Sequence, residues 1–240
     1  MILKLKDYSL IFIVTFLFYV CFLINSKYTK PSLNVSFQDK AVNLNDDILN
    51  IFSLGQKRLI SSLLWTKTML DSDLEHYKKN DLNSWMFLRF NTITKLTPNF
   101  YEAYLYGGVY LSIVKDDILG ARLLYEKGLD KYPNDSQLLL NFGFHLFHEE
   151  GKVDEALSIY EKLYSTNNYP PFLPILMARL KQNGGDLFGS YILLKNMLLN
   201  LEEDNHLYIR VSDRIKEIEF KMNELCLQGQ TNFCIKKGGD

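Results

Sequence analysis

One close pair of histidines is the first place where this sequence could do chemistry. His145 and His148 are three residues apart and are followed by Glu149 and Glu150. On a helix, such a pair can point two imidazoles at one metal ion. The zincin motif needs His-Glu-x-x-His, and its inverted form needs a glutamate directly before the second histidine, where this chain has Phe147. No third ligand is identifiable, so we expect no metal site, with His145 on the packed side of a helix and His148 on its open side.

Glycine pairs and acidic clusters are the other places where a ligand could bind. The pairs at 107–108 and 184–185 lack the GxGxxG and GxxxxGK spacings of phosphate loops. The acids at 116–117 and 202–204 lack the alternating oxygen ligands of a calcium loop. No Gly-x-Ser-x-Gly occurs. We therefore predict no catalytic residue, no cofactor and no small-molecule substrate.

Two of the three cysteines lie close together near the C-terminus. Cys226 and Cys234 are separated by seven residues. In an oxidising compartment they could close a small disulfide loop that pins the tail to the last helix. In a reducing compartment they would be two free thiols, and the sequence leaves both possibilities open.

Composition and charge limit the classes to which the protein can belong. The chain has 240 residues, 47% of them hydrophobic and 23% charged, which is ordinary for a folded protein. The formal net charge is −1, but residues 1–30 carry four lysines and one aspartate, a charge of +3 that leaves −4 for the rest. An acidic body lacks the basic surface of a nucleic-acid binder. Three cysteines are too few for a disulfide-built scaffold.

The N-terminus contains an apolar segment. Residues 8–24 hold no charged side chain, and lysines flank them on both sides. These 17 residues would form a helix about 26 Å long, slightly shorter than a bilayer core of about 30 Å. Snorkelling lysines make a span feasible, so the expectation is a single transmembrane helix that serves as an anchor over residues 1–25.

A cleaved signal peptide is the main alternative to this anchor, and a buried core helix is a third reading. With Ser26 before the cleavage site, Ile24 would occupy position −3, where a small residue is preferred. A very short N-terminus before an apolar segment usually stays in the cytoplasm. The expected localisation is therefore the inner membrane, single-pass, with the N-terminus in the cytoplasm and the body in the periplasm.

Behind this segment, the pattern predicts a linker followed by helices. Residues 26–46 are polar and lack a helical period, so they are expected to form the linker. Apolar residues spaced by three, four and seven predict helices over 48–79, with a break near 53–55, and over 82–96. A last amphipathic helix over 203–226 would cap the helical domain, which spans 47–226, and a polar tail follows over 227–240.

An internal repeat of about 35 residues runs through the second half of the chain. The clearest units are 101–135, 136–169 and 170–199. Small residues recur at two places where paired helices would cross closely, and a larger residue recurs four positions after the second of them. The predicted repeat-packing residues are Gly108, Ala121, Tyr125, Gly143, Ala156, Tyr160, Ala178 and Ser190.

This repeat resembles the tetratricopeptide repeat (TPR) family. The second unit matches its pattern at Gly143, Leu146, Gly151, Ala156 and Tyr160. The first unit matches at Tyr104, Gly108, Leu111, Ala121, Tyr125, Gly128 and Pro133. Both units carry one extra residue before the turn, and the third is degenerate. The resemblance implies an all-α, right-handed solenoid of antiparallel helix pairs. The layout also looks like that of bacterial inner-membrane proteins with one anchor and a short TPR array.

The resemblance also implies where a partner would bind. In this family the first helix of each pair lines a concave face across which partner peptides lie. The positions carried over are Glu102, Tyr106, Val109, Asn141, Phe144, His148, Ile175 and Arg179. The lysines of the family's carboxylate clamp are missing, so a hydrophobic or helical ligand is expected. Alternatively, the protein's own N-terminal helices or tail cover Tyr106 and Phe144.

The function expected from the sequence is a membrane-anchored, non-enzymatic scaffold. It would dock a protein or peptide partner and assist assembly of an envelope complex. The alternative is a permanent structural subunit of a pilus, secretion or transport machine. An enzyme is disfavoured because no set of polar side chains converges.

Overall fold

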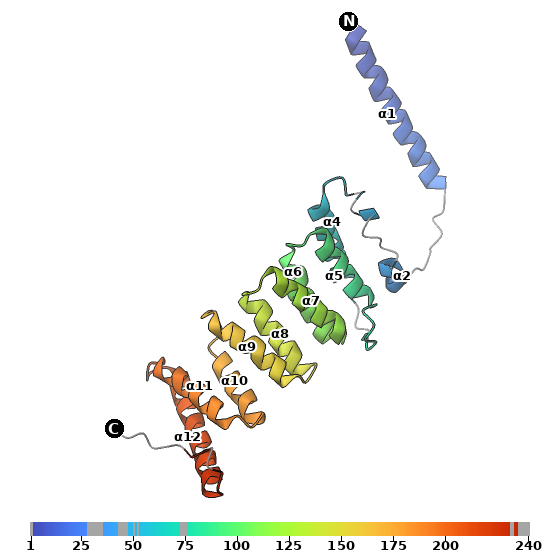
Figure 1. Cartoon of the computed structure of the whole chain (residues 1–240). Helices are drawn as coiled ribbons and strands as arrows, with labels where there is room; N and C mark the ends of the chain where they lie inside the picture. Colours follow the sequence, from blue (N-terminus) through green and yellow to red (C-terminus); the bar gives the residue numbers. More distant parts are fainter. Residues whose placement is uncertain are drawn as a thin grey trace. The chain divides into compact units, whose positions relative to one another are not determined.

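The computed structural model describes residues 2–27, 36–42, 48–49, 51, 53–72, 76–230 and 233–234. Within these ranges all regular secondary structure is helical, which confirms the predicted all-α fold class. The chain divides into two compact units, residues 1–36 and 37–240. Figure 1 labels the helices of both units.

The first unit contains one helix, α1 (Ile2–Lys27), which includes the apolar residues 8–24. None of the helices that the structure describes is both long enough and apolar enough to cross a membrane. The predicted transmembrane helix is therefore wrong, and with it the predicted single-pass inner-membrane localisation. The uncharged stretch of 17 residues reaches about 26 Å, less than a bilayer core of about 30 Å, and the rest of α1 includes the charged residues Lys4, Lys6 and Asp7.

The second unit is a succession of helices. They are α2 (Phe37–Val42), α4 (Lys57–Leu70), α5 (Trp85–Leu96), α6 (Tyr101–Val109), the π-helix η1 (Tyr110–Val114), α7 (Ile118–Lys131), α8 (Ser136–His148), α9 (Val153–Ser165), α10 (Leu173–Asn183), α11 (Leu187–Leu199) and α12 (His206–Leu227). Helices α6–α7, α8–α9 and α10–α11 pack as pairs, and each pair also contacts the next. The partners in a pair run in opposite directions because a short turn joins them (Figure 1).

Short polar residues fix where several of these helices begin. Asp117, Asp135 and Asp186 precede α7, α8 and α11, and each side chain accepts a hydrogen bond from the N–H three residues further on. Such caps satisfy backbone donors that have no partner within the helix. Asn205 caps α12 in a similar way. The turns between helices are therefore specified locally, by single side chains.

Small residues let the two helices of a pair approach closely. A Cβ built on Gly108 of α6 would lie 2.5 Å from the Tyr125 ring of α7, and the Tyr160 ring of α9 covers Gly143 of α8 in the same way. Only glycine leaves room for these rings. The structure buries all eight residues predicted from the repeat: Gly108, Ala121, Tyr125, Gly143, Ala156, Tyr160, Ala178 and Ser190.

The first two repeat units each carry one extra residue before the turn between their two helices. In both units this residue is accommodated by a wider last turn of the first helix. In the first unit the chain forms η1, and the N–H of Asp117 donates to the carbonyl of Leu111 at 2.9 Å. The second unit has the equivalent bond, from Lys152 N–H to the carbonyl of Leu146 at 2.8 Å. A residue inserted into a helix is accommodated by such a wide turn without changing the register of the residues before it.

The N-terminal part of this unit differs most from expectation. Helix α4 ends at Leu70, and residues 76–80 are not helical, although a helix was expected to 79. The side chain of Asp71, directly after α4, accepts a hydrogen bond from Arg89 of α5 at 2.9 Å, and this buried ion pair holds the chain where the helix stops. Residues 37–42, expected within the linker, form α2, whose Phe37 ring packs 5.4 Å from the Trp85 ring.

The last helices have an apolar core of their own. Helix α12 packs on α11, and its residues Val211, Ile215 and Met222 are buried in this core. Cys226 and Cys234 form a disulfide with an S–S distance of 1.98 Å. The side chain of Phe233, next to Cys234, packs against the same apolar core. Most of the predicted tail, residues 231–232 and 235–240, lies outside the described residues.

Candidate functional site: an exposed face and an arginine pocket

The eight positions predicted to face a partner lie on the first helices of the three pairs. We refer to them as the first-helix face; they are Glu102, Tyr106 and Val109 of α6, Asn141, Phe144 and His148 of α8, and Ile175 and Arg179 of α10. Each side chain is exposed or half-buried. Helices α6 and α8 contact each other directly, so their residues belong to one surface.

Two aromatic side chains stand out on this face. Tyr106 is 51% exposed and Phe144 is 42% exposed, whereas Leu105 and Phe142 on the same helices are buried in the core. The imidazole of His148 stacks on Phe144, with 5.1 Å between ring centroids and 12° between planes. Within the second unit, the described helices leave both rings exposed, so α4 and α5 do not bury them.

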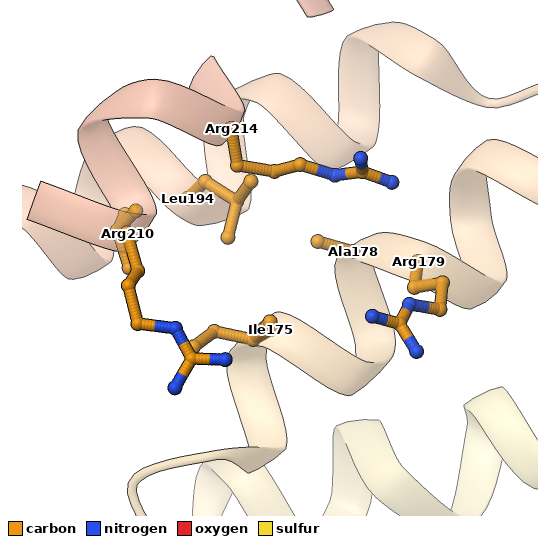
Figure 2. Close-up of a pocket in the computed structure, with 7 residues that line it drawn as sticks. Ile175, Ala178, Arg179, Leu194, Arg210 and Arg214 are labelled. Atoms are coloured by element: carbon orange, nitrogen blue, oxygen red, sulfur yellow. The ribbon is translucent and has the colours of Figure 1, made fainter. Parts of the chain in front are cut away.

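Towards the C-terminal end, the face runs into a pocket of about 140 Å³ between α10, α11 and α12. Its lining combines an apolar surface, formed by Ile175, Ala178, Leu194 and Val211, with the side chains of Arg179, Arg210 and Arg214. Figure 2 shows Arg179 reaching in from α10, and Arg210 and Arg214 from α12, around the apolar residues. Ile175 and Arg179 were predicted for a partner-binding face; the two arginines of α12 were not.

The charges of this pocket are poorly balanced. Arg214 donates to Glu217 at 2.6 Å and to the Gln182 side-chain oxygen at 2.8 Å. Arg179 and Arg210 form no ion pair with any residue that the structure describes, and no acidic side chain lines the pocket. Three guanidinium groups around an apolar surface are suited to an anionic group attached to an apolar chain.

At the other end, Glu102 borders a larger cleft of about 500 Å³. Arg58, Ser62 and Thr66 of α4 contribute to its walls together with Trp65, whose ring packs 5.7 Å from Phe90 and 5.8 Å from Phe100. The lining therefore combines polar and aromatic side chains.

A buried polar network lies behind the face. Ser112 Oγ of η1 lies 2.8 Å from His145 Nδ1 of α8, and His145 Nε2 lies 3.2 Å from Glu150 Oε1. Serine, histidine and glutamate in contact are also the groups of a hydrolase triad. Here Ser112 is 2% exposed and His145 is 1% exposed, so no substrate can reach the hydroxyl. The network instead joins one repeat to the next.

Arg122 of α7 extends this network to the surface. Its guanidinium donates to Glu126 at 3.0 Å, to Glu150 at 2.7 Å and to Glu155 at 2.6 Å. Burial opposes the ionisation of Glu150, but hydrogen bonds from Lys152 and Arg122 outweigh it and lower the pKa of this carboxyl below its usual value. Arg122 thus connects the first helix pair to the second.

Burial also decides the protonation state of His145. Because the charged imidazole would lose its hydration, the pKa of His145 is lowered from 6.5, although Glu150 and Glu149 oppose the shift. The exposed His148 is on the other side of α8, as predicted. Among the described residues, no group of three or more His, Cys, Asp or Glu side chains is placed to hold a metal ion.

No family model matches the chain, and no curated protein is significantly similar to it.

Proposed function

We propose that residues 37–234 form a non-enzymatic, TPR-like scaffold that binds a segment of another protein on the first-helix face. The observation that carries this proposal is the pair of exposed aromatic rings, Tyr106 and Phe144, on neighbouring helices whose opposite sides are fully packed. Neighbouring exposed aromatics on a rigid surface are typical of protein-interaction sites.

The packing behind the face supports the same proposal. The glycine–tyrosine contacts and the Ser112–His145 contact fix the positions of α6 and α8 before any partner arrives. A preorganised surface loses little conformational entropy on binding, so most of the energy of its contacts is available for affinity. Val109, Phe144 and Arg179 are spaced by 35 residues and lie on the first helices of three successive pairs. One extended or helical ligand would therefore contact all three pairs.

A peptide selection tests this proposal and does not require the partner to be identified first. The purified full chain would be used to select binders from a display library of random peptides. Selected peptides would then be titrated against the wild type and a Tyr106→Ser/Phe144→Ser variant. A Phe188→Ser/Phe220→Ser variant is the matched control, because these rings are also exposed, at 53% and 72%, but lie on α11 and the outer side of α12.

The expected result is selection of apolar peptides whose affinity falls by about tenfold or more in the first variant and little in the control. Failure to select any peptide would contradict the proposal. So would an equal loss of affinity in both variants.

A further inference from the structure

The arginine pocket is lined by three arginines and four apolar residues. Arg179 of α10 and Arg210 and Arg214 of α12 line it together with Ile175, which is half-buried (Figure 2). The other apolar lining residues are fully buried: Ala178, Leu194 and Val211. The three arginine side chains come from two different helices and lie on different sides of the pocket (Figure 2). Their positions follow from the packing of α12 onto α10 and α11, which buries Val211 beside Arg210.

A comparison with Arg122 shows what is missing from the pocket. Arg122 is surrounded by three glutamates, at 2.6 to 3.0 Å, as expected in a body with excess negative charge. In contrast, Arg179 and Arg210 have no ion pair with a described residue, whereas Arg214 donates to Glu217 through Nη1 and to Gln182 through Nη2. Like charges that share a pocket repel each other, and a bound anion would relieve that repulsion.

We propose that this pocket recognises side-chain carboxylates of the bound protein segment, at an Asp or Glu next to an apolar residue. The inference rests on the proposed function, since it specifies the ligand of the same face. Planar guanidinium groups donate two parallel hydrogen bonds to a carboxylate. The adjacent apolar residue would cover the half-buried Ile175 and exclude water from those bonds.

The number of donors favours an acidic segment over a chain terminus. Three guanidinium groups present more N–H donors than one carboxylate can accept. Two acidic side chains, a turn apart on a helix or alternating in an extended chain, would use them more completely. The excess negative charge of residues 31–240 makes a nucleic acid a poorer match for the surface around the pocket.

The experiment uses two random peptide libraries on the purified full chain. In one library the peptides are fused at their C-termini, so only side chains can supply a carboxylate; in the other the C-terminus is free. Selected peptides are titrated against the wild type and an Arg179→Gln/Arg210→Gln/Arg214→Gln variant. The matched control is Lys162→Gln/Lys216→Gln/Lys221→Gln, which removes the same charge from exposed positions outside the pocket.

The expected result is enrichment of Asp or Glu beside an apolar residue in the fused library. Affinity should fall by about tenfold or more in the arginine variant and by about twofold or less in the lysine control. Changing the acids of a selected peptide to Asn or Gln should cause a similar loss with the wild-type protein, so the test does not depend on the folding of the variant.

Several outcomes would overturn the inference. They are selected peptides without acidic enrichment, equal losses in the arginine and lysine variants, or acidic binding seen only with free C-termini. If peptides lose affinity in Tyr106→Ser/Phe144→Ser but not in the arginine variant, the inference fails and the proposed function stands. If no peptide is selected from either library, the proposed function fails as well.

Discussion

The ring of Tyr160 in α9 packs against the Cα of Gly143 in α8, so that three ring atoms lie within 2.8 Å of the position that a Cβ on Gly143 would take. Gly108 and Tyr125 have the same relationship in the preceding pair. The repeat therefore preserves a steric fit as well as a sequence pattern. This fit sets how closely two helices pack and how the face on the first helix is presented.

Gly143→Ala should destabilise the protein. The added methyl overpacks the contact with Tyr160, which costs about 1–3 kcal/mol and exceeds the gain of about 0.5–1 kcal/mol from replacing glycine inside a helix. Urea unfolding followed by circular dichroism measures the difference. The matched control is Gly184→Ala, because a Cβ there meets only ordinary contacts at 3.6 Å and the backbone already has φ −79°. Equal stability of the two variants would show that the helices do not cross as described.

Acid should destabilise the protein through His145. Its pKa in the folded chain lies below the unfolded value of about 6.5, so the unfolded chain binds one more proton as the pH falls below 6.5. Stability is retained above that value and is lost as the pH falls towards the folded pKa. The lowered pKa of Glu150 adds a second loss below about 4.5.

The measurement is the free energy of unfolding between pH 8 and pH 5 for the wild type and two histidine variants. His145→Gln should flatten the pH dependence between 7 and 5, because the titrating group is gone. His148→Gln is the matched control, because that imidazole is on the same helix and is exposed. A slope that persists in His145→Gln would assign the acid sensitivity to other groups.

Removing Arg122 should weaken the junction between the first and second helix pairs. The carboxylate of Glu150 is only 8% exposed, and Arg122→Met would remove one of its charged partners. The free energy of unfolding should fall by about 1–3 kcal/mol. Lys216→Met is the control; it breaks a pair exposed by 70% and 63%, where a change of at most about 1 kcal/mol is expected. A double-mutant cycle with Glu150→Gln isolates the coupling. A coupling energy near zero would contradict the proposed junction.

The disulfide should tie the end of α12 to the residues behind it. Closing so short a loop stabilises the folded protein by at most about 2–3 kcal/mol in the chain-entropy model. Alkylation of the unfolded, unreduced protein should modify one thiol, Cys21, and alkylation after reduction should modify all three. Mass spectrometry distinguishes the two results. Modification of three thiols without reductant would show that Cys226 and Cys234 are not joined.

The sequence was most informative where the same packing occurs more than once. The 35-residue spacing of Gly108 and Gly143 predicts a recurring close approach of helices, and both glycines lie under tyrosine rings. Prediction was poorer where one tertiary contact decides the outcome. The apolar pattern of residues 48–79 continues past Leu70, but α4 ends there, and the next residue, Asp71, forms an ion pair with Arg89 of α5.

The site could be predicted only in part for a similar reason. Repeat register was sufficient to place Phe144 and Arg179 on exposed surfaces of first helices. It could not show that Arg210 and Arg214 join Arg179, because that depends on how α12 packs against α10. Their four-residue spacing beside the apolar stripe of Val211 and Ile215 was the available signal. The contact between Ser112 and His145 carried no such signal, since it crosses from one repeat to the next.

Hydroxyl-radical footprinting of the full chain with a selected peptide tests the central claim most directly. Oxidation of Tyr106 and Phe144, the exposed rings of the first-helix face, should fall several-fold when the peptide saturates the protein, while Phe188 and Phe220 should stay as reactive as in the free chain. Unchanged oxidation of Tyr106 and Phe144 with the peptide bound, or protection confined to Phe188 and Phe220, would contradict the claim that partners bind across α6 and α8.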